Sequence, residues 1–583
     1  MAKLRKPEPE FDPAALDALI GARRLMSRRE NSVAAAVLAV VSAAVMAREL
    51  GAHAVFSCIQ ADTVAYFNWV RQVADSFASG VLLPRWMPDA HGAYGSPAFV
   101  FYAPLLFYLT AAVKLVTRDP FSAMALAKVL GLFLSGLFTY AFVKDLWGFR
   151  AGVVASLVYM LLPYRVFDLY FLGTHASKFA LVWFPLILFF CNRAVHEEKL
   201  GRGTAGLAVS YALLCLTHLL PAYMFTPVLV GFGLVIGRER LSVAAARVAL
   251  GCVLGIALAA FYLIPVMIER PWVHFDILTK LEIFQYSKNF LFFPFAPRSP
   301  QNPTFYGDLA RIILVSTVFA ASFYTAAAVL KKQPVTHVEA FFVACAAVPL
   351  FLMSSLSSFV WAHVSGMKML QFPTRWSAVL VFALACLAGA GTHRLQFSQV
   401  NSRRAALLLV PVLAALLLCL RYDARIIANA CRLTESELGG GFRWFEVNEY
   451  VPATVSLYWL RENAYKNIAT PASSSDAGAT VAVNTWDPAR RVLTISASRA
   501  TTLRIRTFYY PGWRGYIDAN ESPLTVEGAS GAILMRVPEG DHRVILTFGN
   551  TPDRRIGILL SILAILVVVM LAGRGTARVA SFW

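Results

Sequence analysis

Ionisable residues at the ends of long apolar runs are the first candidates for chemistry in this sequence. Asp62 follows the first run, Arg165 and Asp168 lie in a later polar break, and Arg375 precedes another run. A carboxylate can take a proton from a hydroxyl group or hold a metal ion, and a guanidinium binds phosphate oxygens at two points. Asp62 and Asp168 are therefore catalytic candidates, and Arg375 is the candidate phosphate clamp.

Each of these residues also has a structural interpretation. Asp62 can be an ordinary solvated aspartate, and Asp168 can pair with Arg165 three residues away. Arg375 can extend to the lipid headgroups from the end of a helix. Residue type alone leaves both interpretations open.

Further polar residues lie between apolar runs. His175 and Lys178 stand at an expected helix start, where they either bind an anion or anchor the chain at the membrane interface. His218 separates two apolar runs, and it either belongs to a site or is a hydrogen-bonded histidine of the helix bundle. A last cluster opens a long loop and either joins the site or pairs internally: Glu269, Arg270, His274 and Asp276.

The elements that position these residues are membrane helices. Of the 583 residues, 58% are hydrophobic and 15% are charged, whereas soluble proteins carry about 25% charged residues. Apolar runs long enough to cross ~30 Å of hydrocarbon recur from residue 32 to the last run, which begins near Ile556. We expect a polytopic α-helical membrane protein.

The net charge of +19 does not indicate nucleic-acid binding, because of where the charge lies. Between Arg421 and Arg555, 16 basic residues face 14 acidic ones, so most of the excess falls in short loops of the membrane half. Basic short loops are typical of the cytoplasmic side. We expect a basic cytoplasmic N-terminus (1–31), an uncleaved first helix and a cytoplasmic C-terminus in the cell (inner) membrane.

This charge asymmetry predicts about twelve transmembrane helices. We expect a membrane domain over 32–420, an extracytoplasmic domain over 421–555, and a last helix with its tail over 556–583. The expected external connections are 51–121, 164–178, 218–221, 267–309, 357–375 and 421–555.

The segment Pro97–Val116 is ambiguous. It is apolar, but Pro97, Pro104, Lys114 and a row of aromatic residues favour a position along the membrane interface. A plain transmembrane helix is the alternative. Only the interfacial position keeps the basic loops on one side.

The region 421–555 has alternating stretches such as Thr502–Tyr509, separated by turn-forming residues, which predict a small β-sandwich. Trp513 follows a Pro-Gly turn, and it either fills the core or contacts a sugar. Six of the eight cysteines lie in apolar runs, and the two external ones, Cys58 and Cys431, leave a disulfide open.

Several short motifs occur in a characteristic order. They are Leu83-Pro-Arg-Trp-Met-Pro-Asp-Ala-His-Gly-Ala-Tyr-Gly-Ser-Pro97, Phe99-Val-Phe-Tyr-Ala-Pro104, Pro163-Tyr-Arg-Val-Phe-Asp168, Leu216-Thr-His218, Phe261-Tyr-Leu-Ile-Pro265, Leu370-Gln-Phe-Pro-Thr-Arg375 and Tyr510-Pro-Gly-Trp513. Together they resemble a family of bacterial and archaeal membrane proteins labelled 6-pyruvoyl-tetrahydropterin synthase-related. That family in turn resembles the C-type fold of membrane glycosyltransferases.

The resemblance implies a polyprenyl-phosphate-linked sugar donor and an external acidic residue just after the first helix. It also implies a long loop after the seventh helix that closes over the donor. Asp62 matches the acidic position, and Ile268–Leu309 matches the loop. The implied acceptor is an extracytoplasmic lipid, glycan or protein, and the donor-binding set is Arg375, Arg165, His175, Lys178, His218, Glu269 and Arg270.

One departure bears on activity. Where relatives continue with a glycine and then a glutamate in the second external loop, this chain has Gly173-Thr-His-Ala-Ser-Lys178. The alternatives are a catalytically degenerate glycan-binding or assembly factor and a transporter for lipid-linked glycans. No cofactor is implied with certainty, and a divalent metal at Asp62 is left open.

Overall fold

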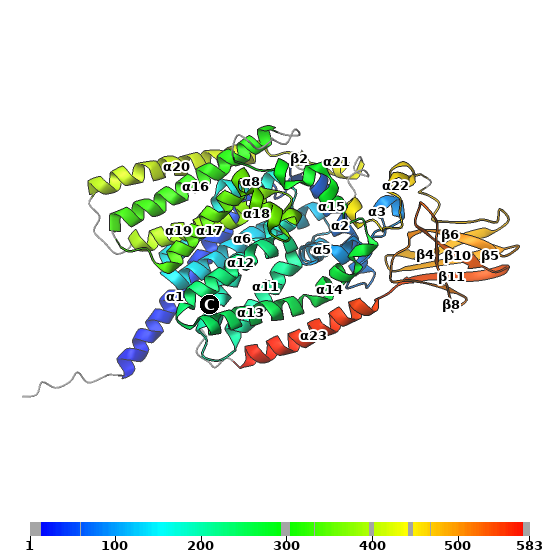
Figure 1. Cartoon of the computed structure of the whole chain (residues 1–583), viewed down its shortest axis with the longest axis horizontal. Coiled ribbons are helices and arrows are strands. Elements are labelled where there is room, and N and C mark those ends of the chain that lie inside the picture. The colour runs from blue at the N-terminus through cyan, green and yellow to red at the C-terminus, as the bar shows by residue number, and fades with distance from the viewer. Residues whose placement is uncertain are drawn as a thin grey trace, which may run out of the picture.

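The computed structural model describes residues 13–58, 60–292, 303–331, 333–395, 402–440, 447–466 and 468–574. A helical bundle makes up most of the described chain, and the strands from Ala472 onward form a lobe at one end of it (Figure 1). The bundle helices are α1 (Pro13–Val45), α6 (Pro120–Trp147), α7 (Phe149–Leu161), α8 (Pro163–Phe171), α9 (His175–Ala180), α10 (Trp183–His196), α11 (Arg202–Thr217), α12 (Leu219–Ile236), α13 (Leu241–Leu258), α14 (Ala260–Glu269), α16 (Pro303–Lys331), α17 (His337–Leu352), α19 (Ser377–Leu395), α20 (Ser402–Asn429) and α23 (Pro552–Gly573).

Among the described residues, seven helices are long and apolar enough to cross a membrane, or eight if the bent pair α7–α8 is one span. The predicted twelve spans are therefore not confirmed. Helices such as α11, with 16 residues, and α17, also with 16, are shorter than the roughly 20 residues that a span needs. Apolar runs that look continuous in sequence are divided in the structure.

The first of the predicted external segments, residues 51–121 (called the first external segment below), is largely helical. It contains α2 (Gln60–Ala78), α3 (Ala90–Ala93), α4 (Ala98–Phe101) and α5 (Leu105–Thr117). The ambiguous apolar stretch is thus divided at Tyr102–Pro104, and the 13 residues of α5 rise only about 20 Å. An interfacial position for this stretch remains our prediction.

The other predicted external loops also contain helical turns. The expected loop 164–178 is mostly α8, which bends by 40° from α7. The short elements in and around the other connections are α15 (Ile277–Lys280), α18 (Ser358–His363), α21 (Glu435–Gly440), α22 (Leu457–Asn463) and the 3₁₀ turns η1 (Arg238–Arg240), η2 (Arg270–Trp272), η3 (Glu282–Phe284), η4 (Tyr286–Lys288), η5 (Ser355–Ser357), η6 (Met367–Leu370), η7 (Pro373–Trp376) and η9 (Asn448–Tyr450).

The C-terminal lobe contains two antiparallel sheets, as the alternating pattern predicts. One has the order β3-β6-β10-β9 and the other β4-β5-β11-β7-β8. Strands β5 and β11 pair from Arg490 with Thr547 to Ala497 with Gly540. The strand bounds are β3 (Ala472–Ser474), β4 (Thr480–Asp487), β5 (Arg490–Ala497), β6 (Thr501–Phe508), β7 (Trp513–Ile517), β8 (Asn520–Ser522), β9 (Thr525–Val526), β10 (Ala532–Val537) and β11 (Gly540–Phe548).

The first external segment is attached to the residues that follow α20. A short pair joins β1 (Val55–Phe56) to β2 (Arg432–Leu433), and Cys58 forms a disulfide with Cys431. The structure thus contains the bridge that the sequence left open. It joins two parts of the chain that are 373 residues apart.

The glycine-containing motif of the first external segment also contacts the C-terminal lobe. Gly92 has a positive φ of 68°, and a Cβ there would lie 2.2 Å from the carbonyl oxygen of Ala464. The Gly92 carbonyl accepts a hydrogen bond from Arg506 at 2.7 Å, and Tyr94 stacks on Phe508 at 4.8 Å. The motif therefore serves close backbone packing between the bundle and the sheets.

Candidate functional site

Asp62 lies in the first turn of α2 and projects from the same helical face as Tyr66 and Trp69. Tyr66 and Trp69 are buried and thereby hold this face of α2 against the rest of the protein, whereas the Asp62 side chain is exposed. Surrounding protein nevertheless raises the pKa of the Asp62 carboxyl by desolvation, which the positive charges of Arg375 and Lys178 oppose. The two cations are thus the charges that act on this carboxylate.

Arg375 belongs to η7, at the start of α19. Its Nη2 donates to Gln371 Oε1 at 3.2 Å, and its guanidinium lies 5.3 Å from the centre of the Phe372 ring. Among the described residues, the buried Nη1 has no hydrogen-bond partner. A buried unpaired guanidinium nitrogen is costly unless a ligand satisfies it, so Arg375 is prepared to bind an oxyanion.

Tyr102 connects these groups. It lies in the break between α4 and α5, packs edge-on against Trp69 at 4.9 Å, and makes a perpendicular ring contact with His218 at 6.0 Å. Burial raises the pKa of its hydroxyl, with further effects from the charges of Asp62 and Arg375. The tyrosine is therefore near both candidates, although their numbers differ by 313.

His218 is the N-cap of α12. Its Nδ1 accepts a hydrogen bond from the Leu220 backbone at 3.2 Å, which assigns the proton to the other ring nitrogen. The histidine is half-buried beside Tyr102. The structure thus combines the two interpretations of the sequence, because His218 both caps a helix and faces the candidate site.

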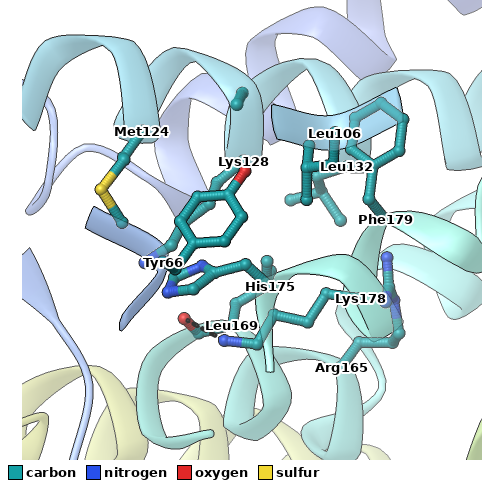
Figure 2. Close-up of a pocket in the computed structure, with 12 residues that line it drawn as sticks. Tyr66, Leu106, Met124, Lys128, Leu132, Arg165, Leu169, His175, Lys178 and Phe179 are labelled. Atoms are coloured by element: carbon teal, nitrogen blue, oxygen red, sulfur yellow. Dashed lines mark hydrogen bonds between the residues drawn. The ribbon is translucent and has the colours of Figure 1, made fainter. Parts of the chain in front are cut away.

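A neighbouring buried cavity contains most of the remaining cationic candidates. Figure 2 shows Tyr66 and His175 ring against ring, with Lys128, Lys178 and Arg165 around them. The two ring centres are 4.7 Å apart. The free space is about 20 Å³, which accommodates one water molecule and no phosphate group.

Ion pairs compensate part of the positive charge around this cavity. Arg165 Nη1 lies 3.7 Å from Asp168 Oδ2, and Lys128 Nζ lies 2.8 Å from Glu49 Oε1. Lys178 Nζ donates to the backbone carbonyls of Leu172 and Leu169. The pairing of Asp168 with Arg165 is the structural interpretation that the sequence also allowed. From this cavity, the positive charge of Lys178 acts on Asp62.

The polar cluster after α14 makes several contacts with residues outside itself. Glu269 instead pairs with Arg554, whereas the exposed Arg270 lies over the Phe275 ring at 4.7 Å. Asp276 pairs with Lys280 at 2.5 Å, and His274 Nε2 contacts the Val455 carbonyl oxygen at 2.8 Å. These contacts lie outside the cluster, and within it the charge of His274 acts on Asp276.

The sequence left open whether Trp513 fills a protein core and whether a metal binds at Asp62. Trp513 is buried and packs against Trp86 at 5.3 Å, so it fills a core shared by the lobe and the first external segment. Within the described residues, no three His, Cys, Asp or Glu side chains gather in a metal-binding arrangement. A metal at Asp62 would need further ligands from a substrate, and we derive no step through one.

Tyr102 and Lys128 are site residues that sequence reasoning missed. Lys128 lies inside the apolar helix α6, where a charged side chain is costly and usually functional. A lysine within an apolar run is visible in the sequence, so Lys128 could have been selected from it. Tyr102 gave no such signal beyond its place in an aromatic motif.

A protein-family model describes "6-pyruvoyl-tetrahydropterin synthase related domain; membrane protein", and it matches residues 99–427, which is more than half of the chain. The chain belongs to this family. The match includes α4 to α19 and hence Tyr102, Arg165, Asp168 and Arg375. An uncharacterized protein of Lactococcus lactis subsp. cremoris (strain MG1363) is 24% identical over 221 residues, which are 34% of this chain and 34% of that protein.

Three solved structures have a similar arrangement of elements. The arabinofuranosyltransferase AftD from mycobacteria is 15% identical, with a TM-score of 0.45 over 69% of this chain and 27% of that one. The Archaeoglobus fulgidus oligosaccharyltransferase is 12% identical, with a TM-score of 0.44 over 69% and 57%. ArnT from Cupriavidus metallidurans, bound to undecaprenyl phosphate, is 13% identical, with a TM-score of 0.30 over 61% and 77%. The chain therefore spans only part of AftD and of the oligosaccharyltransferase.

Proposed function

We propose that this protein is a membrane glycosyltransferase that moves a sugar from a polyprenyl-phosphate donor to an extracytoplasmic lipid, glycan or protein. The observation that carries the proposal is the convergence of an accessible carboxylate, Asp62, with the unpaired guanidinium nitrogen of Arg375. Glycosyl transfer from a phosphate needs both groups, one for a proton and one for the leaving oxyanion. The motifs that resemble the family support the same conclusion.

In the proposed reaction, the acceptor hydroxyl oxygen forms a bond to the anomeric carbon of the sugar. The bond from that carbon to the phosphate oxygen breaks, and its electron pair leaves on the phosphate. Arg375 binds the polyprenyl phosphate formed, because guanidinium matches its oxygens. The acceptor proton passes to a carboxylate of the site; Asp62 is either that carboxylate or a donor ligand.

The cavity cations contribute at longer range. His175 and Lys178 remain predicted donor-binding residues, but a phosphate enters their cavity only if side chains move, since its free space is about 20 Å³. Arg165 and His175 also have buried nitrogens without a hydrogen-bond partner among the described residues, but Arg375 is the better clamp because it does not line this small cavity. We place the site on the outer side of the cell membrane, with both termini cytoplasmic.

The test is transfer of a labelled sugar from a panel of polyprenyl-phosphate sugars in vesicles. Asp62→Asn and Arg375→Ala are compared with Asp308→Asn and Arg311→Ala, which alter an exposed ion pair at 2.9 Å on α16. We expect the transfer rate of the first two variants to fall at least 100-fold, which is about 3 kcal/mol of transition-state stabilisation. The two control variants should keep the rate of the intact protein. Binding of the labelled lipid without transfer by the intact protein would instead support a binding factor.

A further inference from the structure

The 3₁₀ turn η9 lies against the first external segment, although it follows Asp62 by almost 390 residues. Tyr450 stacks on Phe101 with ring centres 5.7 Å apart and planes at 2°. The Tyr450 carbonyl accepts a hydrogen bond from Ser96 Oγ at 3.3 Å. Tyr450 also contacts Trp69 at 6.4 Å. The turn is thus held over α2 and α4.

A second set of contacts fixes η9 from the opposite side. The residues after the turn pair with those after α14, where Val273 and Pro452 form a bridge. The His274 backbone donates to the Val451 carbonyl at 3.1 Å, and the Ala453 backbone donates to Trp272 at 2.8 Å. Backbone hydrogen bonds on one side and stacked rings on the other fix the position of the turn.

This placement brings Glu449 to the candidate site. Glu449 precedes Tyr450, whose partners are Phe101, adjacent to Tyr102, and Trp69, on the Asp62 face of α2. The charges of both Asp62 and Glu449 act on the Tyr102 hydroxyl. Glu449 itself is half-buried, so it is enclosed by protein but retains access to solvent.

We propose that Glu449 is the second catalytic carboxylate of the site and takes the proton of the acceptor hydroxyl. The inference rests on the proposed glycosyl transfer. As the acceptor oxygen bonds to the anomeric carbon, its proton moves to Glu449, and the electron pair of the broken carbon–oxygen bond leaves on the donor phosphate at Arg375. Asp62, under the influence of Arg375 and Lys178, holds the donor sugar through its hydroxyl groups.

Electrostatics support the assignment of the proton to Glu449. Burial, which is the largest effect, and the charge of Asp62 together raise the pKa of this carboxyl to about 7, against opposing effects of a backbone hydrogen bond and of His91. A base that titrates near the working pH is the most effective one. Asp62 has two cations nearby, Arg375 and Lys178, whose charges oppose the rise that desolvation gives its pKa and hold its carboxylate beside the donor phosphate site.

Several titratable and charged groups lie on the elements around Glu449. Those that act on it directly are Asp62 and His91, and those whose own ionisation it affects are Tyr102 and Tyr450. On the segment after α14, His274 contacts the Val455 carbonyl oxygen, Asp276 pairs with Lys280, and Arg270 lies over the Phe275 ring. Burial is the largest effect on the Glu449 proton, and Asp62 is the acidic neighbour whose charge adds to it.

The assignment also accounts for the departure seen in the second external loop. There, the chain has Gly173-Thr-His-Ala-Ser-Lys178 where relatives continue with a glycine and then a glutamate, and Asp168 is near Arg165. Glu449 supplies a carboxylate from the C-terminal side instead. In this proposal, the second acid of the site comes from η9 and not from the loop 164–178, where relatives have a glutamate.

The test measures sugar transfer from the active donor against pH for the intact protein, Glu449→Gln, Glu449→Asp and the control Glu521→Gln, which alters an exposed residue of β8. We expect Glu449→Gln to lower kcat 100- to 10,000-fold with little change in the donor KM. The acidic limb of the kcat/KM profile, with a midpoint near pH 7, should disappear. Glu449→Asp should restore part of the rate, and Glu521→Gln should behave as the intact protein.

The outcomes of this test distinguish a failure of the proposed function from a failure of the role proposed for Glu449. If the intact protein transfers nothing from any donor, the proposed function is wrong and the role of Glu449 falls with it. If the intact protein is active and Glu449→Gln keeps both its rate and its acidic limb, only the role of Glu449 is wrong. A variant that raises the donor KM alone would make Glu449 a donor-binding residue and also overturn the inference.

Discussion

Arg554, at the start of the last described helix, forms a two-point ion pair with Glu269 at the end of α14. Arg554 Nε lies 2.7 Å from Glu269 Oε1, and Nη2 lies 2.7 Å from Oε2. Tyr510 donates to the same carboxylate at 2.7 Å. Both charged residues are buried, so α23, α14 and the residues before β7 are joined by one polar contact.

We expect Arg554→Met to destabilise the protein by about 3–5 kcal/mol, because it leaves the Glu269 carboxylate buried without its cation. The double variant Arg554→Met with Glu269→Leu should recover much of that loss. Thermal unfolding in detergent measures both. Equal destabilisation by the exposed-pair control Lys280→Met would show that the effect is not specific to burial.

Glu449→Gln should stabilise the protein at alkaline pH. The folded pKa of Glu449 is raised to about 7 from 4.5, so the folded protein holds the proton more tightly than the unfolded chain. The free energy of unfolding of the intact protein therefore falls as pH rises from about 4.5 to 7, by at most about 3 kcal/mol. Unfolding midpoints should coincide for the two proteins near pH 4 and separate by pH 8, and a constant difference at all pH values would contradict this.

Lys178→Met should shift the titration of Asp62. Desolvation raises the pKa of Asp62, and Lys178 is one of the two cations that lower it, so its removal leaves the pKa higher. We expect donor binding to require a higher pH in this variant than in the intact protein. Titration of labelled-donor binding against pH measures the shift, and Lys178→Arg, which keeps the charge, should not reproduce it.

Loss of the Cys58–Cys431 disulfide should weaken the attachment of the first external segment. Cys58 is four residues before Asp62, and the bridge closes a long loop, which stabilises the folded state relative to the unfolded one. Cys58→Ser is expected to increase protease cleavage between β1 and α2 and to reduce transfer. Cys345→Ser, which alters a free cysteine of α17, is the control.

Local features of the fold could be predicted from the sequence because they depend on neighbouring residues. Alternation in Thr502–Tyr509 marks β6, which the structure places at Thr501–Phe508. Helix breaks were harder to locate. Met160 to Arg165 reads as the end of an apolar run followed by a polar break, yet Pro163 begins a new buried helix there. The number of spans consequently remains a prediction.

Some residues of the candidate site could also be predicted from the sequence, whereas their proximity could not. Asp62 and Arg375 could be selected individually, since charged residues beside apolar runs are costly without a purpose. Their proximity, and that of Glu449, depends on long-range packing through Tyr102 and Tyr450, which no local pattern encodes. Asp168 and Arg165 were correctly recognised as potential partners because three residues is one turn of a helix.

The bridge between Cys58 and Cys431 also sets an order of events during synthesis. Its first cysteine is synthesised early, but its partner, 373 residues later, leaves the ribosome only after most of the helices of the bundle have been made. The same holds for η9, which follows Cys431 in sequence. A nascent chain therefore contains Asp62 long before the residues that surround it in the folded protein have been made. The bridge is completed late in synthesis, and its formation requires an oxidising compartment.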